Sequence, residues 1–364
     1  MAGKLKGTKE TFYDRWVREV EQVPQIEGLF VKDINRVELL PWRRKGGNGI
    51  YINLAFQRVD DAHICEIAPA GALNPEKHLF EELILILNGK GATEIWNEGG
   101  EKRTFEWQEG SLFAIPLNCW HRHFNGSGSE PVRYLAITDA PFVLNRFRNL
   151  EMVFNCSFVF ADRYDGSPDY FNAQGKEHSD AILETNFVPD VRTIPLVEDP
   201  HIRSHRFRRF LLAGGTMSVH ISEIPPGQYR FAHRHGAGAH IIWLDGKGYD
   251  LTWETGTDKK HRIDWQAGTL TSPPDWWYHQ HFNTGKTPAR MLAFHYNIRV
   301  SEIKGDFREF VSSNNKKIPF DTEDPEVREA YRRELAKQGL SPNMEEIYRL
   351  EREDGSGSAL SPKG

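Results

Sequence analysis

Three histidines in the second half of the chain have the types and spacing of a metal site. His233 and His235 are separated by one residue, and His279 follows some forty residues later. Side chains two apart on a strand share a face, so both imidazoles of the pair can point at one ion while Arg234 points away. His279 supplies a third nitrogen if the sheet closes on itself. Three neutral imidazoles suit Fe, Mn, Cu, Ni or Zn and leave positions open for substrate, water or dioxygen.

A His-X-His pair taken alone is more often a chance pair on a solvated strand, so the surrounding residues decide the interpretation. The pair lies in the pattern Gly227-x5-His233-x-His235, and the third histidine lies in Gly268-x5-Pro274-x4-His279-x3-Asn283. These patterns resemble the two motifs of the cupin superfamily. The residues that flank the histidines are most similar to those of the gentisate- and salicylate-cleaving dioxygenases. That resemblance implies a barrel fold, Fe(II) held by three histidines, and O2 as a co-substrate.

Two departures from the motifs concern His240 and Trp276. His240 stands where many cupins have a glutamate, and Trp276 stands in place of a glycine. His240 is then either a fourth neutral ligand or a hydrogen-bonding partner of the ligands. A gentisate-like alignment instead sets Ala239 in that position. Losing the glutamate removes a negative charge from the metal and favours an open, labile site.

His281 lies two residues beyond His279 on the same face of the predicted strand. It is a candidate acid or base beside the metal, as is His240, and a purely structural histidine is an equal alternative for His281.

An internal repeat determines the predicted architecture. His63-Ile-Cys-Glu-Ile recurs as His220-Ile-Ser-Glu-Ile 157 residues later, and His121-Arg-His-Phe-Asn recurs as His279-Gln-His-Phe-Asn 158 residues later. Short apolar runs separated by turn residues fill both copies. The duplication predicts an all-β fold of two tandem cupin-like jelly-roll barrels with flanking N- and C-terminal helices.

The repeat and the changes in composition predict five segments. They are an N-terminal helical segment (1–30), the first barrel (31–150), an aromatic-rich connecting segment (151–190), the second barrel (191–300), and a C-terminal helical extension with a tail (301–364). Helical patterns cover 8–23, 324–338 and 343–352. We expect the connecting segment to pack on a barrel, because a flexible linker would be poor in aromatic residues.

The first copy offers a weaker set of ligands: Glu76, His78, Glu82 and His121. They can bind a divalent metal through two nitrogens and carboxylate oxygen, or the barrel is kept for its structure alone. The negative charge of Glu76 and Glu82 would repel an anionic substrate. We therefore expect the chemistry in the second barrel, with His235→Ala losing metal and turnover and His78→Ala keeping measurable activity.

Arginines cluster around the second barrel, and one of them is a candidate anchor for an acidic substrate, because a guanidinium pairs with a carboxylate through two parallel hydrogen bonds. Surface charge is the commoner role of such a cluster. Strand parity predicts that Arg230 and Arg234 point outward.

The composition excludes several classes of protein. A formal net charge of −5 gives no reason to expect nucleic acid binding. No apolar run approaches the roughly 20 residues of a membrane span, and no apolar stretch follows the basic N-terminus as in a secretory signal. Three cysteines without metal or disulfide spacing are typical of a cytoplasmic protein. The cupin resemblance, with apolar faces on the terminal helices, implies a homo-oligomer.

The leading functional hypothesis is a mononuclear non-haem Fe(II) dioxygenase that acts on a small, hydroxylated aromatic carboxylic acid. A second hypothesis keeps the site and replaces oxygen chemistry with Lewis-acid catalysis by Mn, Ni or Zn, as an isomerase, decarboxylase or hydrolase. A third is a non-catalytic ligand-binding bicupin. The sequence alone leaves all three open.

Overall fold

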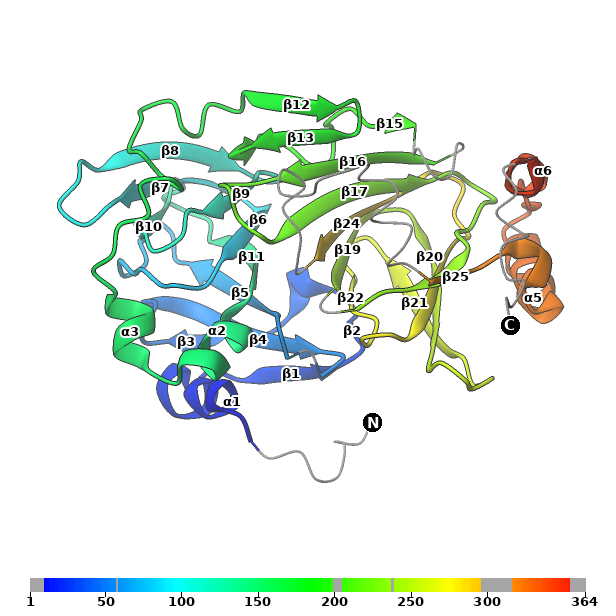
Figure 1. Cartoon of the computed structure of the whole chain (residues 1–364), viewed down its shortest axis with the longest axis horizontal. Coiled ribbons are helices and arrows are strands. Elements are labelled where there is room, and N and C mark those ends of the chain that lie inside the picture. The colour runs from blue at the N-terminus through cyan, green and yellow to red at the C-terminus, as the bar shows by residue number, and fades with distance from the viewer. Residues whose placement is uncertain (1–9, 57, 199–204, 237–238, 296–315, 354–364) are drawn as a thin grey trace, which may run out of the picture.

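Two β-barrels lie side by side in the computed structural model, with helices at both outer ends (Figure 1). The structure describes residues 10–56, 58–198, 205–236, 239–295 and 316–353. Each barrel consists of one larger and one smaller sheet. The predicted all-β fold of two tandem jelly-roll barrels with flanking helices is confirmed. Within the described residues, no helix is long and apolar enough to cross a membrane.

The larger sheet of the first barrel has the order β1-β4-β5-β11-β6-β9-β14, with β3 beside β4. Its strands are β1 (Gln25–Gly28), β3 (Leu40–Trp42), β4 (Gly47–Leu54), β5 (Asp61–Ile67), β6 (Glu82–Asn88), β9 (Leu112–Ile115), β11 (Val132–Thr138) and β14 (Phe187–Val188). The smaller sheet consists of β10 (Trp120–Asn125), β7 (Lys90–Trp96) and β8 (Arg103–Gln108). Burial alternates along β10, so His121, His123 and Asn125 point inward.

The larger sheet of the second barrel has the order β12-β13-β16-β17-β24-β19-β22-β2, with β15 beside β16. Its strands are β2 (Phe30–Val31), β12 (Gly175–Ser179), β13 (Ile182–Thr185), β15 (Val197–Glu198), β16 (Arg206–Leu211), β17 (Ser218–Ile224), β19 (Ala239–Asp245), β22 (Leu270–Thr271) and β24 (Ala289–His295). The smaller sheet consists of β21 (His261–Gln266), β20 (Lys247–Trp253), β23 (Tyr278–Asn283), β18 (Ala232–Arg234) and β25 (Lys316–Ile318).

The barrels exchange two short strands. β2 lies between β1 and β3 of the first barrel in sequence but pairs with β22 of the second, and β14 lies between β13 and β15 of the second barrel but pairs with β9 of the first. The exchange is pseudo-symmetric, because the backbone N–H of Ile34 donates to Gly268 and that of Val191 donates to Gly110, both at 2.9 Å. Each barrel is therefore completed by the other.

The two larger sheets pack face to face and bury the main hydrophobic core between the barrels. This core takes Ile64, Leu83 and Ile137 from one sheet and Val219 and Phe294 from the other. The barrel interiors have separate cores, which in the second barrel include the stacked rings of Trp243 and Trp265. The histidines predicted as metal ligands thus lie in barrels whose larger sheets are packed against each other.

Three short helices cover the first barrel: α1 (Phe12–Trp16), α2 (Ala140–Phe147) and α3 (Leu150–Asn155). α1 continues as a π-helical turn at 17–21, and the helix ends at Gln22, which has a left-handed conformation with φ of 54°. The start of the predicted helix at residues 8 and 9 lies outside the described residues. A 3-10 turn also forms at Ile34–Arg36.

The connecting segment packs on the first barrel. The ring of Phe171 stacks on that of Phe105 at 3.8 Å, and Tyr164 is buried beside Ile95 and Cys119. The segment also contains the hairpin β12–β13, which strand patterns in the sequence did not indicate.

The C-terminal extension forms a 3-10 turn at Phe320–Thr322, then α5 (Pro325–Ala336) and α6 (Glu345–Glu353). Asp324 caps α5 by accepting the N–H of Glu326 at 3.0 Å, as its sequence predicts. Both helices pack on the smaller sheet of the second barrel through Tyr331 and Ile347. The predicted tail lies outside the described residues.

Candidate metal centre

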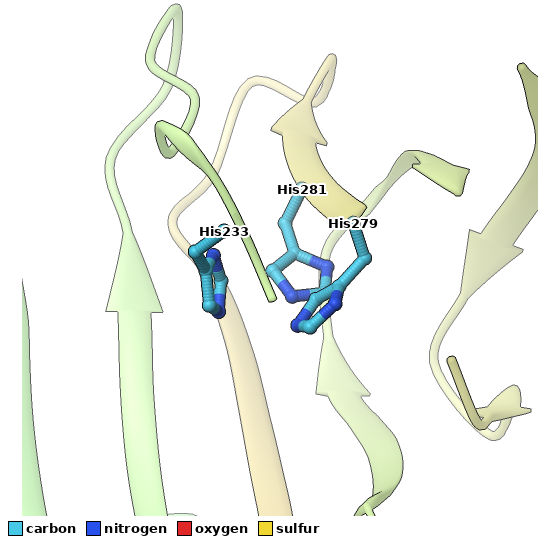
Figure 2. Close-up of side chains that lie close together, drawn as sticks. All are labelled: His233, His279 and His281. Carbon is cyan, nitrogen blue, oxygen red and sulfur yellow. The ribbon is translucent and has the colours of Figure 1, made fainter. Parts of the chain in front are cut away.

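The second barrel brings three histidines together from two neighbouring strands. β18 pairs with β23 so that His233 lies opposite His279, and His281 follows two residues later on β23. Each offers a ring nitrogen, and these nitrogens all lie within 4.8 Å of one another. Figure 2 shows the three rings turned toward a common point. The arrangement is close enough for one metal ion to draw the nitrogens into its coordination shell.

His235 lies at the edge of this cluster. Its ring centroid is 4.9 Å from that of His279 and 5.8 Å from that of His233. Its backbone oxygen accepts the N–H of Trp276 at 3.0 Å. Trp276 replaces the motif glycine and has a φ of 64°, the left-handed region that glycine adopts without strain. Trp276 thus adopts the backbone conformation of the motif glycine, and the hydrogen bond from its N–H to His235 holds the loop that carries this histidine.

The protonation state of these rings favours metal binding. Burial, followed by the neighbouring histidines, lowers the pKa of His233 and of His279 well below the usual value. Burial likewise lowers the pKa of His235. Neutral imidazoles keep the lone pair that a metal ion needs.

His281 is oriented by a buried carboxylate. Its Nδ1 lies 2.8 Å from Asp250 Oδ1, and the same oxygen accepts the indole N–H of Trp265 at 2.8 Å. Nδ1 therefore carries the proton, which leaves Nε2 as the ring nitrogen available to the cluster. A cavity of about 10 Å³ lies beside His281, His279, Asp250 and Ser272. It is about the smallest space that holds one water molecule.

His240 lies outside the cluster, contrary to the prediction that it is a ligand or a catalytic residue. It is fully buried between the barrels, where its Nδ1 lies 3.3 Å from Asp60 Oδ2. Ala239 pairs with His295 across the sheet, as Glu82 pairs with Thr138 in the first barrel. The structure thus matches the alternative alignment, in which Ala239 occupies the glutamate position. Side chains alternate along a strand, so His240 faces the opposite side of β19.

Two further histidines line this barrel, and sequence reasoning did not assign them to the site. His295 Nε2 lies 3.1 Å from His220 Nδ1, and the His295 ring lies 5.4 Å from that of His235. Burial lowers the pKa of both well below the usual value. His220 is part of the sequence repeat, and that was the one available signal. An imidazole pair therefore lies beside Ala239, the position that Glu82 occupies in the first barrel.

Arg230 points into the second barrel, contrary to the parity argument. Its Nη1 donates to Ser222 Oγ on β17 at 3.2 Å, and its positive charge is one of the causes that lower the pKa of His233. Parity fails because Arg230 precedes the first residue of β18, so strand alternation does not extend to it. The barrel thus has a guanidinium close to the histidine cluster.

The first barrel also gathers its predicted ligand residues. His78, Glu82 and His121 are buried and offer ligand atoms within 4.8 Å of one another. Glu82 Oε2 lies 3.2 Å from His78 Nε2 and 3.6 Å from His121 Nε2, and Glu82 Oε1 lies 3.4 Å from His63 Nε2. Glu76 Oε1 lies 3.6 Å from His121 Nε2. By donor type alone, these residues fit a divalent ion.

A buried lysine shares this first-barrel cluster. Lys45 is 3% exposed, and its Nζ lies 2.5 Å from Glu76 Oε1 and 3.7 Å from Glu82 Oε1. Burial lowers the pKa of Lys45, but the charges of Glu76 and Glu82 outweigh it, so the net shift is upward. Burial also opposes ionisation of Glu76, while Lys45 and Arg44 hold its pKa well below the usual value. Lys45, Arg44 and Glu76 are therefore all ionised at neutral pH.

Comparisons with known proteins identify the fold. No family model and no curated protein matches the chain. Among solved structures, a mutant of the Bacillus subtilis oxalate decarboxylase matches with a TM-score of 0.50 and 13% identity, over 79% of this chain and 84% of that one. The Lactobacillus farciminis oxalate decarboxylase in complex with formate matches with a TM-score of 0.51 and 13% identity, over 79% and 91%. A further oxalate decarboxylase structure, on substrate binding and reaction specificity, has a TM-score of 0.51 and 12% identity, over 93% and 88%.

The chain has a bicupin fold. At this level of identity, the likeness concerns the fold and not the reaction. The solved structures named above are decarboxylases, so they give no support to the closer resemblance to ring-cleaving dioxygenases.

Proposed function

We propose that the second barrel is the active site of a metal-dependent enzyme that removes a carboxyl group from a small chelating carboxylic acid without net oxidation. The observation that carries the proposal is the cluster of His233, His279 and His281, in which His281 is paired with the carboxylate of Asp250. One part of the site suits a metal ion, and the other suits a proton donor.

His233 and His279 of the cluster would hold the ion together with His235, whose ring lies 4.9 Å from that of His279, and His281 would be left for proton transfer. The donor set of the three ligands suits Fe(II) and Mn(II) alike, so it does not select between them. When bound, such an ion would chelate oxygens of the acid and withdraw electron density from the carbon–carbon bond that breaks.

Arg230 would bind and orient the substrate carboxylate. A guanidinium makes two parallel hydrogen bonds to a carboxylate, which fixes its direction as well as its position. Arg230 reaches into the barrel from beside β18, and its backbone N–H donates to the carbonyl of His281 at 3.0 Å. Its charge also favours an anionic substrate over a neutral one.

His281 would supply the proton. Loss of CO2 leaves the electron pair of the broken bond on the remaining carbon, and the protonated imidazole donates its Nε2 proton to that carbon. Asp250 keeps the ring in the orientation required and stabilises its protonated form. Water would return the proton to His281, so the sum is RCOO⁻ plus H⁺ giving RH plus CO2.

A dioxygenase is the second candidate function. The absence of a carboxylate at the Ala239 position favours it, because an all-histidine site leaves the ion more open to O2. The fold shared with oxalate decarboxylases instead supports our main proposal, decarboxylation without net oxidation.

Gas analysis separates the two candidates. Protein reconstituted with Fe(II) or Mn(II) is incubated with oxalate, other small keto and hydroxy acids, and hydroxybenzoates, with and without O2. We expect CO2 release without stoichiometric O2 uptake. O2 consumed in proportion to substrate would favour the dioxygenase, and ligand binding without turnover on any acid would contradict an enzymatic role.

A further inference from the structure

A lysine ammonium stands where the ligand-position side chains of the first barrel converge. Lys45 lies in the turn between β3 and β4, far in sequence from both motifs, and its side chain is 3% exposed. Its nearest carboxylates belong to Glu76 and Glu82, at 2.5 and 3.7 Å. These are the two acidic members of the predicted ligand set.

The ammonium is one member of a buried chain of alternating charges. In order, these groups are Glu21, Arg44, Glu76, Lys45 and Glu82. Arg44 Nε lies 2.6 Å from Glu21 Oε1, and Arg44 also pairs with Glu76. Each of the three inner groups, Arg44, Glu76 and Lys45, thus has an opposite charge on both sides.

The remaining carboxylate oxygen faces histidine nitrogens. Glu82 Oε2 has the Nε2 atoms of His78 and His121 at 3.2 and 3.6 Å. Glu76 Oε1 is therefore already matched to the ammonium and Glu82 Oε2 to the ring of His78. Glu82 Oε1 and His121 Nε2 have no hydrogen-bond partner among the described residues, and Glu82 Oε1 faces the ammonium only through the 3.7 Å ion pair. Breaking such a buried pair costs far more than a surface pair, because it leaves an uncompensated charge.

We infer that Lys45 is the resident cation of the first barrel and takes the place of a metal ion there. A divalent ion bound by His78, Glu82 and His121 would lie within a few ångströms of the ammonium, and at that range two like charges repel strongly in a buried site. The donor types of the first barrel fit a metal, but the lysine among them does not. The duplicated barrels have diverged into one suited to a metal ion and one closed by an internal ion pair.

Metal counting tests this directly and does not depend on the reaction catalysed. Apoprotein is dialysed against Co(II) alone, and bound metal is measured by elemental analysis in wild type, His121→Ala and His279→Ala, with far-UV circular dichroism to check folding. We expect His121→Ala to bind as much metal as wild type. Folded His279→Ala should bind one equivalent less than wild type, and none in total.

A variant designed to gain a metal ion in the first barrel provides a second, independent test. Lys45→Met/Glu76→His removes one charge of each sign and restores a histidine at the first motif position, while Arg44 keeps Glu21 as a partner. We expect it to bind one equivalent more than wild type, and His121→Ala in that background to remove the added equivalent.

Two results would overturn the inference. One is a Co(II) equivalent that wild type binds and that His121→Ala loses or folded His279→Ala keeps. The other is a folded double variant that gains no metal. Failure of the proposed decarboxylase is a separate outcome, because it would appear as absent turnover in protein that binds metal as expected.

Discussion

Equivalent histidines in the two barrels have different partners. His281 has the carboxylate of Asp250 at 2.8 Å, whereas His123 in the first barrel has the hydroxyl of Thr93 at 2.8 Å. A carboxylate stabilises a protonated imidazole and a hydroxyl does not, so the proton-transfer role that we propose for His281 has no counterpart at His123.

We predict that Asp250→Asn lowers kcat 10–100-fold while bound metal stays near the wild-type level, a range typical for partners that orient groups at a metal site. Thr93→Val is the matched control in the first barrel and should leave kcat unchanged. Steady-state kinetics with elemental analysis measure both. Equal losses in the two variants would mean that these contacts only support the fold.

Asp61 makes stability depend on pH. Burial raises the pKa of this carboxyl from 3.8 to about 7, although the hydroxyls of Thr138 and Tyr13 donate to it and partly oppose the shift. The folded protein therefore holds a proton that the unfolded chain releases above about pH 4. The contribution of Asp61 to stability is fully present below pH 4 and is lost as pH rises toward 7.

We predict that the difference in unfolding free energy between wild type and Asp61→Asn changes by about 3 kcal/mol between pH 4 and pH 7, in the direction that disfavours wild type at the higher pH. Denaturant titrations at several pH values measure this difference. A constant difference over that range would show that Asp61 ionises normally in the folded protein.

At the scale of elements, the C-terminal extension holds both strands that carry the histidine cluster. β25 pairs with β18, with Lys317 opposite His233. Glu323 accepts the side-chain N–H of Gln280 at 2.6 Å and the hydroxyl of Tyr229 at 2.6 Å. Gln280 lies between His279 and His281 on β23, so the extension fixes the backbone of the cluster from outside the barrel.

We predict that Glu323→Leu lowers stability by about 3 kcal/mol, because it leaves the buried amide N–H of Gln280 without its acceptor and removes the carboxylate partner of the Tyr229 hydroxyl and of Arg328. It should also weaken metal binding, since the strand holding two of the histidines loses its support. Thermal unfolding with and without Co(II) measures both effects. Glu326→Leu, which removes only an exposed pair with Arg333, should change stability by less than about 1 kcal/mol. A metal affinity unchanged in Glu323→Leu would contradict the positioning role.

For the whole molecule, the exchanged strands make each barrel depend on the other. Val31 of β2 and Val188 of β14 are both buried in the core between the larger sheets. β2 completes the second barrel, and β14 completes the first. Each barrel therefore lacks a strand unless the part of the chain that forms the other barrel is also folded.

We predict one cooperative unfolding transition for the whole chain, not two. Val188→Ala should lower its midpoint without splitting it. Differential scanning calorimetry, compared with circular dichroism and tryptophan fluorescence, measures this. Two resolved transitions, with only one shifted by Val188→Ala, would show that the barrels unfold independently.

The sequence predicted the duplication and the two-barrel fold, because fixed spacing on strands determines which side chains share a face. It predicted His233, His235 and His279 as ligands with His281 near them, whereas the structure gathers His233, His279 and His281 and leaves His235 at the edge. The sequence did not decide between His240 and Ala239, because a one-residue uncertainty in the preceding loop moves a side chain to the opposite face of the strand. The exchanged strands carry a short repeat, Phe30-Val-Lys-Asp33 and Phe187-Val-Pro-Asp190, but their partners lie too far along the chain to be read from pattern.

Lys45 and Arg230 show what else spacing leaves out. Lys45 meets Glu76 from a turn 31 residues away, and Arg230 turns inward just before its strand begins. Both positions follow from how distant segments pack and not from local periodicity.

The central claim is that the second barrel binds the metal and carries out the reaction. His279 and His121 occupy equivalent positions in the repeat, and both are buried, so substitution by alanine removes the same group in each barrel. Turnover and bound metal measured together in His279→Ala and His121→Ala test the claim most directly. We predict that His279→Ala loses its metal and at least about 100-fold in activity, more than the loss from partners around a metal site, while His121→Ala keeps both. An inactive, metal-free His121→Ala beside an active His279→Ala would place the chemistry in the first barrel and contradict the account.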